Sequence, residues 1–309
     1  MGGLHHITAI AGNAARNLDF YTRVLGMRLV KKTVNFDDPE TYHLYYGDET
    51  GRPGSILTFF PWSNAAAGRT GVGSVQEVLL RVPTSALSFW IHRFVELGVN
   101  HQLITRRFGE PFLAFTDPDG LTLALVGSSV PAEPGWSNGT IPAEHSIQCL
   151  HGAGLLLALA APTSEILANI LNYKAAEQDG TVLRLTSNSG RGDILDVREA
   201  GDFLTDRMGR GSVHHIAFAA KDDEQQERMA HRLRTEHGLQ PTEQKDRLYF
   251  RSVYFREPGG ILFEIATEQP GFTVDEPLGS LGSSLKLPPF LENRRPRIEA
   301  ILPLLEQAP

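Results

Sequence analysis

The stretches LHHITAI at residues 4–10 and VHHIAFA at residues 213–219 are two copies of one short pattern. A second pattern also occurs twice, as FTDPDGLTLALV at 115–126 and as FREPGGILFEIA at 255–266. The two patterns alternate along the chain, and self-similarity of this kind indicates an architecture built from repeated units. The search for the fold therefore starts from the repeat.

Weaker copies complete the repeat, LHGAGLL at 150–156 for the first pattern and PGSILTFF at 53–60 for the second. Each opening segment leads into a helical pattern, for example between Asn13 and Gly26, with a capping residue before it and a glycine after it. Short alternating segments joined by Gly, Pro and Asp turns follow each helix, as expected for strands. The sequence therefore predicts four strand–helix–strand–strand–strand modules, at roughly 2–62, 75–128, 149–199 and 212–268.

Four βαβββ modules predict an α+β fold with curved mixed sheets. Pairing consecutive modules gives a first domain at 2–130 and a second at 149–268. Residues 269–309 are rich in Pro and Gly, and we expect a C-terminal arm with a short final helix near Ile298–Leu305.

Composition excludes several classes of protein. Of 309 residues, 41% are hydrophobic and 21% charged, which is ordinary for a globular chain. The net charge of −7 argues against nucleic-acid partners and anionic membrane surfaces. The single cysteine, Cys149, rules out a disulfide framework and a cysteine zinc site. We see no signal peptide and no apolar run near the roughly 20 residues of a membrane span, and we expect a cytoplasmic protein.

Aligning the modules shows which repeated positions could bind a metal. The second position of the HH pair holds His6, Gly152 and His215, and the position of Glu264 in module four is matched to Phe59 and Ala124. Only His6, His215 and Glu264 have side chains that can coordinate a metal.

Glu264 stands in the apolar segment ILFEIA, where burying a carboxylate is costly unless it is paired or metal-bound. Taken alone, an HH pair is more often the polar end of a strand than a pair of metal ligands. A lone buried Glu in a strand is likewise more often the partner in an ion pair than a metal ligand. Their coincidence at repeated positions favours a metal site with two His and one carboxylate, as in non-haem Fe(II) enzymes. A four-ligand zinc or nickel site would need a second carboxylate, which Phe59 cannot supply.

Three ligands of one metal must meet in space, although His6 lies in module one and the other two lie in module four. We therefore expect module one to pack against module four, leaving modules two and three to form a metal-free half. A separation of His6 and His215 above about 10 Å would contradict this expectation.

These motifs resemble the vicinal oxygen chelate superfamily of glyoxalases, bleomycin-resistance proteins and extradiol dioxygenases. LHHIT, SVHHIAF, LFEIA and YHLYYGDETGRPGSILTFFPW at 42–62 are similar to hydroquinone ring-cleaving dioxygenases, over about residues 4–290. The resemblance implies Fe(II) ligands at His6, His215 and Glu264. It also places five further residues near the metal: His5, Thr8, His214, Arg247 and Tyr254.

Strand parity and chemistry suggest roles for these five residues. Thr8 shares the parity of His6 and should face the metal, whereas His5 and His214 have the opposite parity and could buttress the ligands. His214, Tyr254 and His5 are candidate proton carriers, and Arg247 could hold a phenolate or superoxide oxygen. The remaining seven histidines are placed outside the triad: His43, His92, His101, His145, His151, His231 and His237.

We therefore expect an Fe(II)-dependent dioxygenase that uses O₂ to cleave a small aromatic diol of hydroquinone or catechol type. The same ligands would also hold Mn(II). Two alternatives stay open, a glyoxalase-type isomerase or lyase acting on a thiol adduct and a non-catalytic protein that binds aromatic compounds. We expect no nucleic-acid or membrane partner, and we expect a homo-oligomer.

Overall fold

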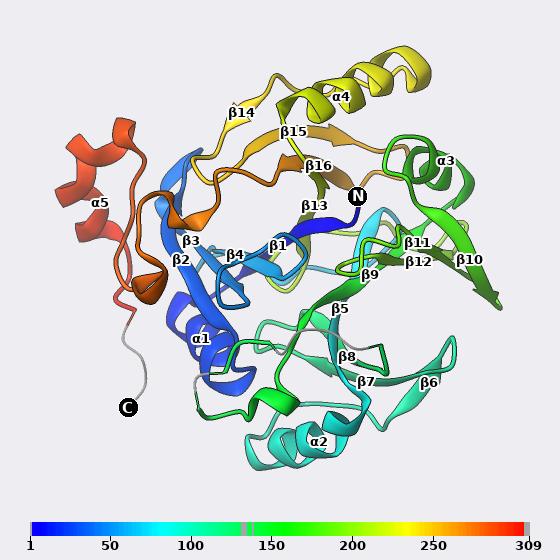
Figure 1. Ribbon diagram of the computed structural model, residues 1–309, viewed down its shortest axis with the longest axis horizontal. Coiled ribbons are helices and arrows are strands. Elements are labelled where there is room, and N and C mark those ends of the chain that lie inside the picture. Colours follow the sequence, from blue (N-terminus) through cyan, green and yellow to red (C-terminus); the bar gives the residue numbers. More distant parts are fainter. Residues whose placement is uncertain (1, 131–134, 138, 306–309) are drawn as a thin grey trace.

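The computed structural model describes residues 2–130, 135–137 and 139–305, and the four predicted modules are visible as four groups of strands with one helix each (Figure 1). The expected α+β fold with curved mixed sheets is confirmed. The elements of module one are β1 (Leu4–Ala11), α1 (Ala14–Asp19), a π-helical turn (Phe20–Val24), β2 (Arg28–Asn35), β3 (Asp38–Gly47) and β4 (Ile56–Pro61). Those of module two are β5 (Ser74–Pro83), α2 (Leu87–Glu96), β6 (Thr105–Arg107), β7 (Glu110–Thr116) and β8 (Thr122–Ser128).

The second half of the chain repeats this order. Module three consists of β9 (Cys149–Leu157), α3 (Ala161–Asn169), β10 (Lys174–Asp179), β11 (Val182–Thr186) and β12 (Ile194–Glu199). Module four consists of β13 (Val213–Ala220), α4 (Asp223–His237), β14 (Lys245–Asp246), β15 (Arg251–Arg256) and β16 (Leu262–Thr267). An arm of short 3₁₀ turns and the helix α5 (Arg295–Ile301) follows, and its last four residues, 306–309, lie outside the described part of the chain.

The strands form two eight-stranded sheets that combine modules out of sequence order. One sheet has the order β14-β15-β16-β13-β1-β4-β3-β2 and the other β10-β11-β12-β9-β5-β8-β7-β6. In each sheet the first strands of two modules pair antiparallel at the centre, β1 with β13 and β5 with β9. Sheet membership thus joins module one to module four and module two to module three. The division into 2–130 and 149–268 does not follow the sheets, because both central pairings, β1 with β13 and β5 with β9, join a strand of the first range to a strand of the second.

Local signals explain where α1 and α4 begin and where α4 ends. The Asn13 side chain accepts a hydrogen bond from the Arg16 N–H and caps α1, and Asp222 caps α4 by accepting from Gln225. Gly238 ends α4 with a φ of 63°. α5 begins at Arg295 and ends at Ile301, earlier than the expected Ile298–Leu305.

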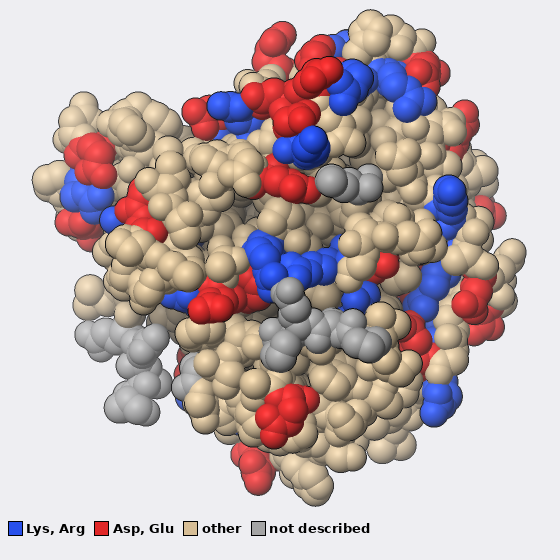
Figure 2. All heavy atoms as spheres, in the orientation of Figure 1, with Lys and Arg blue, Asp and Glu red and all other residues tan. Residues whose placement is uncertain are grey.

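On the face shown in Figure 2, acidic and basic side chains lie together over α4. They include the i,i+4 pairs Glu224–Arg228 and Arg232–Glu236, which are exposed to solvent.

None of the helices in the described part of the chain combines the length and the apolar composition that a membrane-spanning helix needs.

A buried ion-pair cluster connects the C-terminal arm to the sheet that contains β1 and β13. This sheet carries the predicted metal-binding residues His6, His215 and Glu264, and it is called the metal-side sheet. The Lys31 side chain on β2 is fully buried and its ammonium contacts both Asp275 and Glu276 of the arm. Tyr249 donates a hydrogen bond to Asp275 (3.0 Å), and its own carbonyl accepts one from Gly271. The arm therefore connects the edge strand β2 to the loop that follows β14, which carries Arg247.

We predict that Lys31→Met lowers the free energy of unfolding by about 3 kcal/mol, because it leaves the carboxylate of Glu276 buried without its cation. Arg297→Ala is the matched control, since it removes an exposed ion pair between the same arm and Glu40 and should cost under about 1 kcal/mol. Urea unfolding of both variants measures the difference. Equal losses would contradict the assignment of Lys31 as the anchor of the arm.

Candidate metal centre

Each HH pair sits at a β-bulge in the central pairing of β1 with β13. Leu4 pairs with Phe218 and His6 with Ala217, so His5 is an extra residue on β1. Thr8 pairs with His215 and Ala9 with Val213, so His214 is an extra residue on β13. A bulge re-aims the side chains around it. Both histidines of each pair can therefore approach the same place, which simple strand alternation would not allow.

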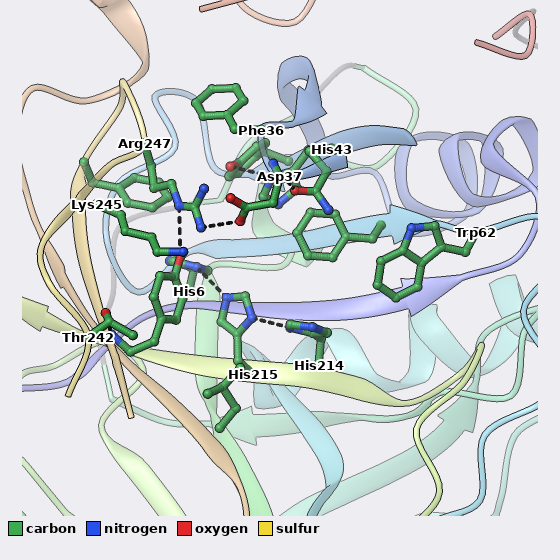
Figure 3. A pocket seen from close by; sticks show the side chains of 16 residues that line it. His6, Phe36, Asp37, His43, Trp62, His214, His215, Thr242, Lys245 and Arg247 are labelled. Carbon is green, nitrogen blue, oxygen red and sulfur yellow. Dashed lines mark hydrogen bonds and ion pairs between the residues drawn. The ribbon is translucent and has the colours of Figure 1, made fainter. Parts of the chain in front are cut away.

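His6, His215 and Glu264 converge on one point from β1, β13 and β16. Their ligand atoms all lie within 4.8 Å of one another, and all three side chains are buried. The Nε2 atoms of His6 and His215 are 3.4 Å apart. Oε2 of Glu264 lies 2.9 Å from Nε2 of His215 and 3.4 Å from Nε2 of His6. The two imidazoles are thus far inside the 10 Å limit set above (Figure 3).

The carboxylate of Glu264 has the features of a metal ligand. Oε1 accepts a hydrogen bond from Ser252 (2.5 Å), but Oε2 is buried with no hydrogen-bond partner among the described residues. Nε2 of His215 lies 2.9 Å from Oε2, but no hydrogen bond joins the two atoms. An orphaned carboxylate oxygen between two imidazole nitrogens is costly unless a cation lies there. These residues therefore fit a divalent metal ion.

Electrostatics favour the protonation states that metal binding needs at Glu264 and His215. Burial alone would raise the pKa of Glu264, but the neighbouring His6 and His215 hold it well below its ordinary value. Burial lowers the pKa of His215, which favours the neutral imidazole. An ionised carboxylate and a neutral imidazole are the forms that coordinate metals.

His5 and His214 hold the ligand rings from behind. Nδ1 of His5 lies 2.9 Å from Nδ1 of His6, and Nδ1 of His214 lies 2.7 Å from Nδ1 of His215. Each bond occupies the Nδ1 of a ligand ring and leaves its Nε2 facing the shared centre. Burial lowers the pKa of both His5 and His214 to about 3, so both rings are neutral.

Thr8, Arg247 and Tyr254 also lie around this centre. Thr8 is opposite His215 across the β1–β13 pairing, and Tyr254 is opposite Glu264 across β15–β16. The Arg247 Nε donates to the Tyr254 hydroxyl (3.3 Å), and Nη2 of Arg247 bonds Asp37 (2.7 Å). Burial raises the pKa of Tyr254 above its ordinary value, so the phenol keeps its proton. All eight site residues predicted from the sequence are thus brought together.

A cavity of about 330 Å³ opens beside His6 and His215 (Figure 3). Its apolar walls include Phe36, Phe60, Trp62 and Phe250, and Phe60 and Trp62 stack with ring centroids 5.6 Å apart. A cavity of this size with aromatic walls suits a small planar ring.

His43, placed outside the site in the sequence analysis, lines this cavity, and so do Tyr45 and Asp37. His43 and Tyr45 are two residues apart on β3, so they share a face of the sheet. Their hydrogen bonds link β3 to β4, since Nε2 of His43 lies 2.8 Å from Oγ1 of Thr58 and Nδ1 lies 2.8 Å from the Tyr45 hydroxyl. Alternation within 42–62 could have grouped this pair, but only the register between strands shows what it faces.

The match of Phe59 to Glu264 is wrong by one residue. β1 pairs with β4 through Thr8 and Thr58, as β13 pairs with β16 through Ala217 and Glu264. Thr58 therefore holds the position of Glu264. A shift of one residue moves a side chain to the opposite face, and Phe59 packs there against Tyr21 with ring centroids 4.4 Å apart.

The second sheet repeats the bulges with different residues. Gln76 on β5 and His151 on β9 are the extra residues, and Glu77 and Gly152 follow them. The register of β9 with β12 puts Asp196 at the place of Glu264. Two arginines compensate these carboxylates, because Arg107 contacts Glu77 and Asp196, and Arg184 contacts Asp196. Within the described ranges, His6, His215 and Glu264 form the one group with metal-binding geometry.

Comparison with known proteins agrees with this architecture. A family model described as the Glyoxalase/Bleomycin resistance protein/Dioxygenase superfamily matches residues 3–125. The Bacillus subtilis protein named "Putative ring-cleaving dioxygenase MhqO" is 43% identical over 96% of this chain and 94% of its own. The "Chlorohydroquinone/hydroquinone 1,2-dioxygenase" of Sphingobium indicum is 35% identical over 94% of this chain and 92% of its own.

Solved structures show the same fold. A Bacillus subtilis crystal structure described as a "putative dioxygenase" has a TM-score of 0.95 at 42% identity, covering 99% of this chain and 98% of that one. Maize glyoxalase I shares the fold with a TM-score of 0.65 at 12% identity, over 87% of this chain and 93% of that one. Identity above 30% across almost the whole length is decisive, and the chain belongs to the glyoxalase/bleomycin resistance protein/dioxygenase superfamily, among relatives named as ring-cleaving dioxygenases.

Proposed function

We propose that this protein is an Fe(II)-dependent dioxygenase that cleaves the ring of a small hydroquinone-type diol with O₂. The observation that carries the proposal is the orphaned Oε2 of Glu264, buried between the Nε2 atoms of His6 and His215 at the wall of an aromatic cavity. The names of the relatives support the reaction class, and one of them names hydroquinone. Catechol-type diols stay a second substrate class.

His6, His215 and Glu264 would hold the metal on one side, and Mn(II) would suit the same ligands. Fe(II) in such a site supplies binding for the diol and activation of O₂. His5 and His214 fix the orientation of the two ligand rings through their Nδ1 bonds. The protein thus provides a buried site with an ionised carboxylate for the cation.

The cavity residues can bind and orient a diol. Phe60 and Trp62 offer an apolar wall on which an aromatic ring can lie. Arg247 is always charged and reaches the cavity, so it can donate hydrogen bonds to a phenolate oxygen. His214 and Tyr254 line the cavity, so they are placed to exchange protons with a bound diol.

The two alternative functions fit less well. A glyoxalase-type site with a fourth protein ligand would need one at the position of Thr58, whose hydroxyl is hydrogen-bonded to Thr8 and His43. A protein that only sequesters aromatic compounds has no need for a buried carboxylate between two imidazoles. The expected homo-oligomer and cytoplasmic location stay predictions.

Oxygen uptake tests the reaction. The protein is loaded anaerobically with Fe(II), and methylhydroquinone or catechol is then added with O₂ in an oxygen electrode. We expect about one O₂ consumed per ring and loss of the aromatic absorbance, with the hydroquinone preferred. Bound iron without O₂ uptake for any diol would contradict the proposed function.

Metal analysis tests the ligand set. We predict one metal ion per chain, and a loss of affinity of about tenfold or more in Glu264→Gln, because the amide brings no negative charge to the cation. His151→Gln is the control, since His151 occupies the corresponding bulge in the second sheet, and its metal content should equal the wild type. Two ions per chain, or full binding by Glu264→Gln, would refute this ligand set.

A further inference from the structure

A row of polar side chains crosses the inner face of the metal-side sheet and ends at a ligand. Tyr45 on β3 pairs with Thr58 on β4, Thr58 pairs with Thr8 on β1, and Thr8 pairs with His215 on β13. Paired residues of neighbouring strands project from the same face. His43 lies two residues before Tyr45 and shares that face. The four non-ligand members of the row are therefore neighbours of the metal centre without being ligands.

These four side chains form one continuous chain of hydrogen bonds. The Tyr45 hydroxyl lies 2.8 Å from Nδ1 of His43, and Nε2 of His43 lies 2.8 Å from Oγ1 of Thr58. The hydroxyls of Thr58 and Thr8 are also 2.8 Å apart. Thr8 and Thr58 are fully buried, and Tyr45 is 3% exposed. The chain is therefore shielded from bulk water over most of its length.

The tautomer of His43 sets the direction of the two bonds that its ring makes, and it determines whether the hydrogen of Thr58 is available to Thr8. Burial and the nearby His6 hold its pKa well below the ordinary value, so the ring is neutral. A neutral imidazole has one N–H donor and one acceptor nitrogen. If Nε2 carries the hydrogen, Tyr45 donates to His43 and His43 donates to Thr58. The hydrogen of Thr58 then goes to Thr8, because Thr8 is the other side chain bonded to that hydroxyl among the described residues. If Nδ1 carries it, all three bonds reverse.

The first direction is favoured by the chemistry of Tyr45. Burial raises the pKa of this phenol well above its ordinary value, so it keeps its hydrogen. A phenolic oxygen shares its lone pairs with the ring and accepts poorly, whereas an imidazole nitrogen accepts well. Tyr45 is therefore the donor, and His43 carries its hydrogen on Nε2. Thr8 is then left as a donor that has no acceptor among the residues that the structure describes.

We propose that His43 is a positioning residue that commits the hydroxyl of Thr58 to Thr8 and thereby frees the hydrogen of Thr8 for an oxygen atom of the reactants. Thr8 suits this role because it lies opposite His215 and on the same face as His6. Its donated hydrogen bond would stabilise negative charge that develops on oxygen during the reaction. The role of Thr8 rests on the proposed function, whereas the tautomer of His43 does not.

Nitrogen NMR tests the direction of the chain without any turnover. The metal-free protein is labelled with ¹⁵N-histidine, and long-range ¹H–¹⁵N spectra are recorded between pH 6 and 8. The signals of His43 are assigned by their loss in His43→Gln. We expect a neutral ring with hydrogen on Nε2 throughout this range. Hydrogen on Nδ1, or a doubly protonated ring, would overturn the proposal even if the enzyme is active.

Steady-state kinetics of matched variants test whether His43 affects turnover through Thr58 and Thr8. Gln at position 43 can keep an N–H donor near the place of Nε2, whereas Leu cannot. We expect His43→Leu and Thr58→Val to lower kcat by about 10-fold to 100-fold, and His43→Gln by about threefold at most. Metal content and the anaerobic Kd for the diol should stay near wild type, which separates positioning from a general loss of structure. Tyr42→Phe is the control on the same strand, because its hydroxyl bonds Pro303 in the arm, and kcat should not change.

Unchanged kcat in His43→Leu, or equal losses in His43→Leu and His43→Gln, would refute the positioning role. An inactive wild type with hydrogen on Nε2 of His43 would instead refute the proposed function while leaving the direction of the chain intact.

Discussion

The ionised carboxylate of Glu264 is fully buried beside the imidazoles of His6 and His215, and the arrangement of the site follows from that burial. A carboxylate in this position needs a positive partner, and no Lys or Arg contacts it among the described residues. The requirement explains why His6 and His215 present their Nε2 atoms to it and why both rings are tied down through Nδ1. The pairing of module one with module four brings β1 beside β13, and so brings His6 to His215 and Glu264.

The second sheet also contains buried carboxylates, but there they are neutralised by arginine side chains. Glu77 and Asp196 occupy places equivalent to those of the ligands, but Arg107 and Arg184 reach them from β6 and β11. A guanidinium group is permanently charged and matches the geometry of a carboxylate. In the second sheet the positive charge beside the carboxylates is an arginine side chain, whereas in the metal-side sheet the candidate partner of Glu264 is a metal ion. The same fold supports a structural charge cluster and a reactive site.

Much of the site could be predicted from the sequence because its signals are local. The repeated HH pairs and a glutamate inside ILFEIA identify the three ligands, and helix caps such as Asn13 and Asp222 mark two of the four modules. Features set by strand register could not be predicted. The hydrogen-bond partner of His43 could not be predicted from the sequence, because its bond to Thr58 depends on the pairing of β3 with β4. Phe59 was matched to Glu264 through an error of one residue, which in a strand is the difference between the two faces. The expected packing of module one against module four matches the sheet order, whereas the division into domains at 2–130 and 149–268 does not follow the sheets and stays a prediction.

Anomalous X-ray diffraction at the iron edge, from crystals of the Fe(II)-loaded protein, tests the central claim most directly. The account predicts one peak per chain, at bonding distance of roughly 2.0–2.2 Å from Nε2 of His6, Nε2 of His215 and a carboxylate oxygen of Glu264. It predicts no peak between Glu77 and Asp196, where Arg107 lies. Iron bound at the second sheet, or an iron-loaded crystal with no peak at the three ligands, would contradict it.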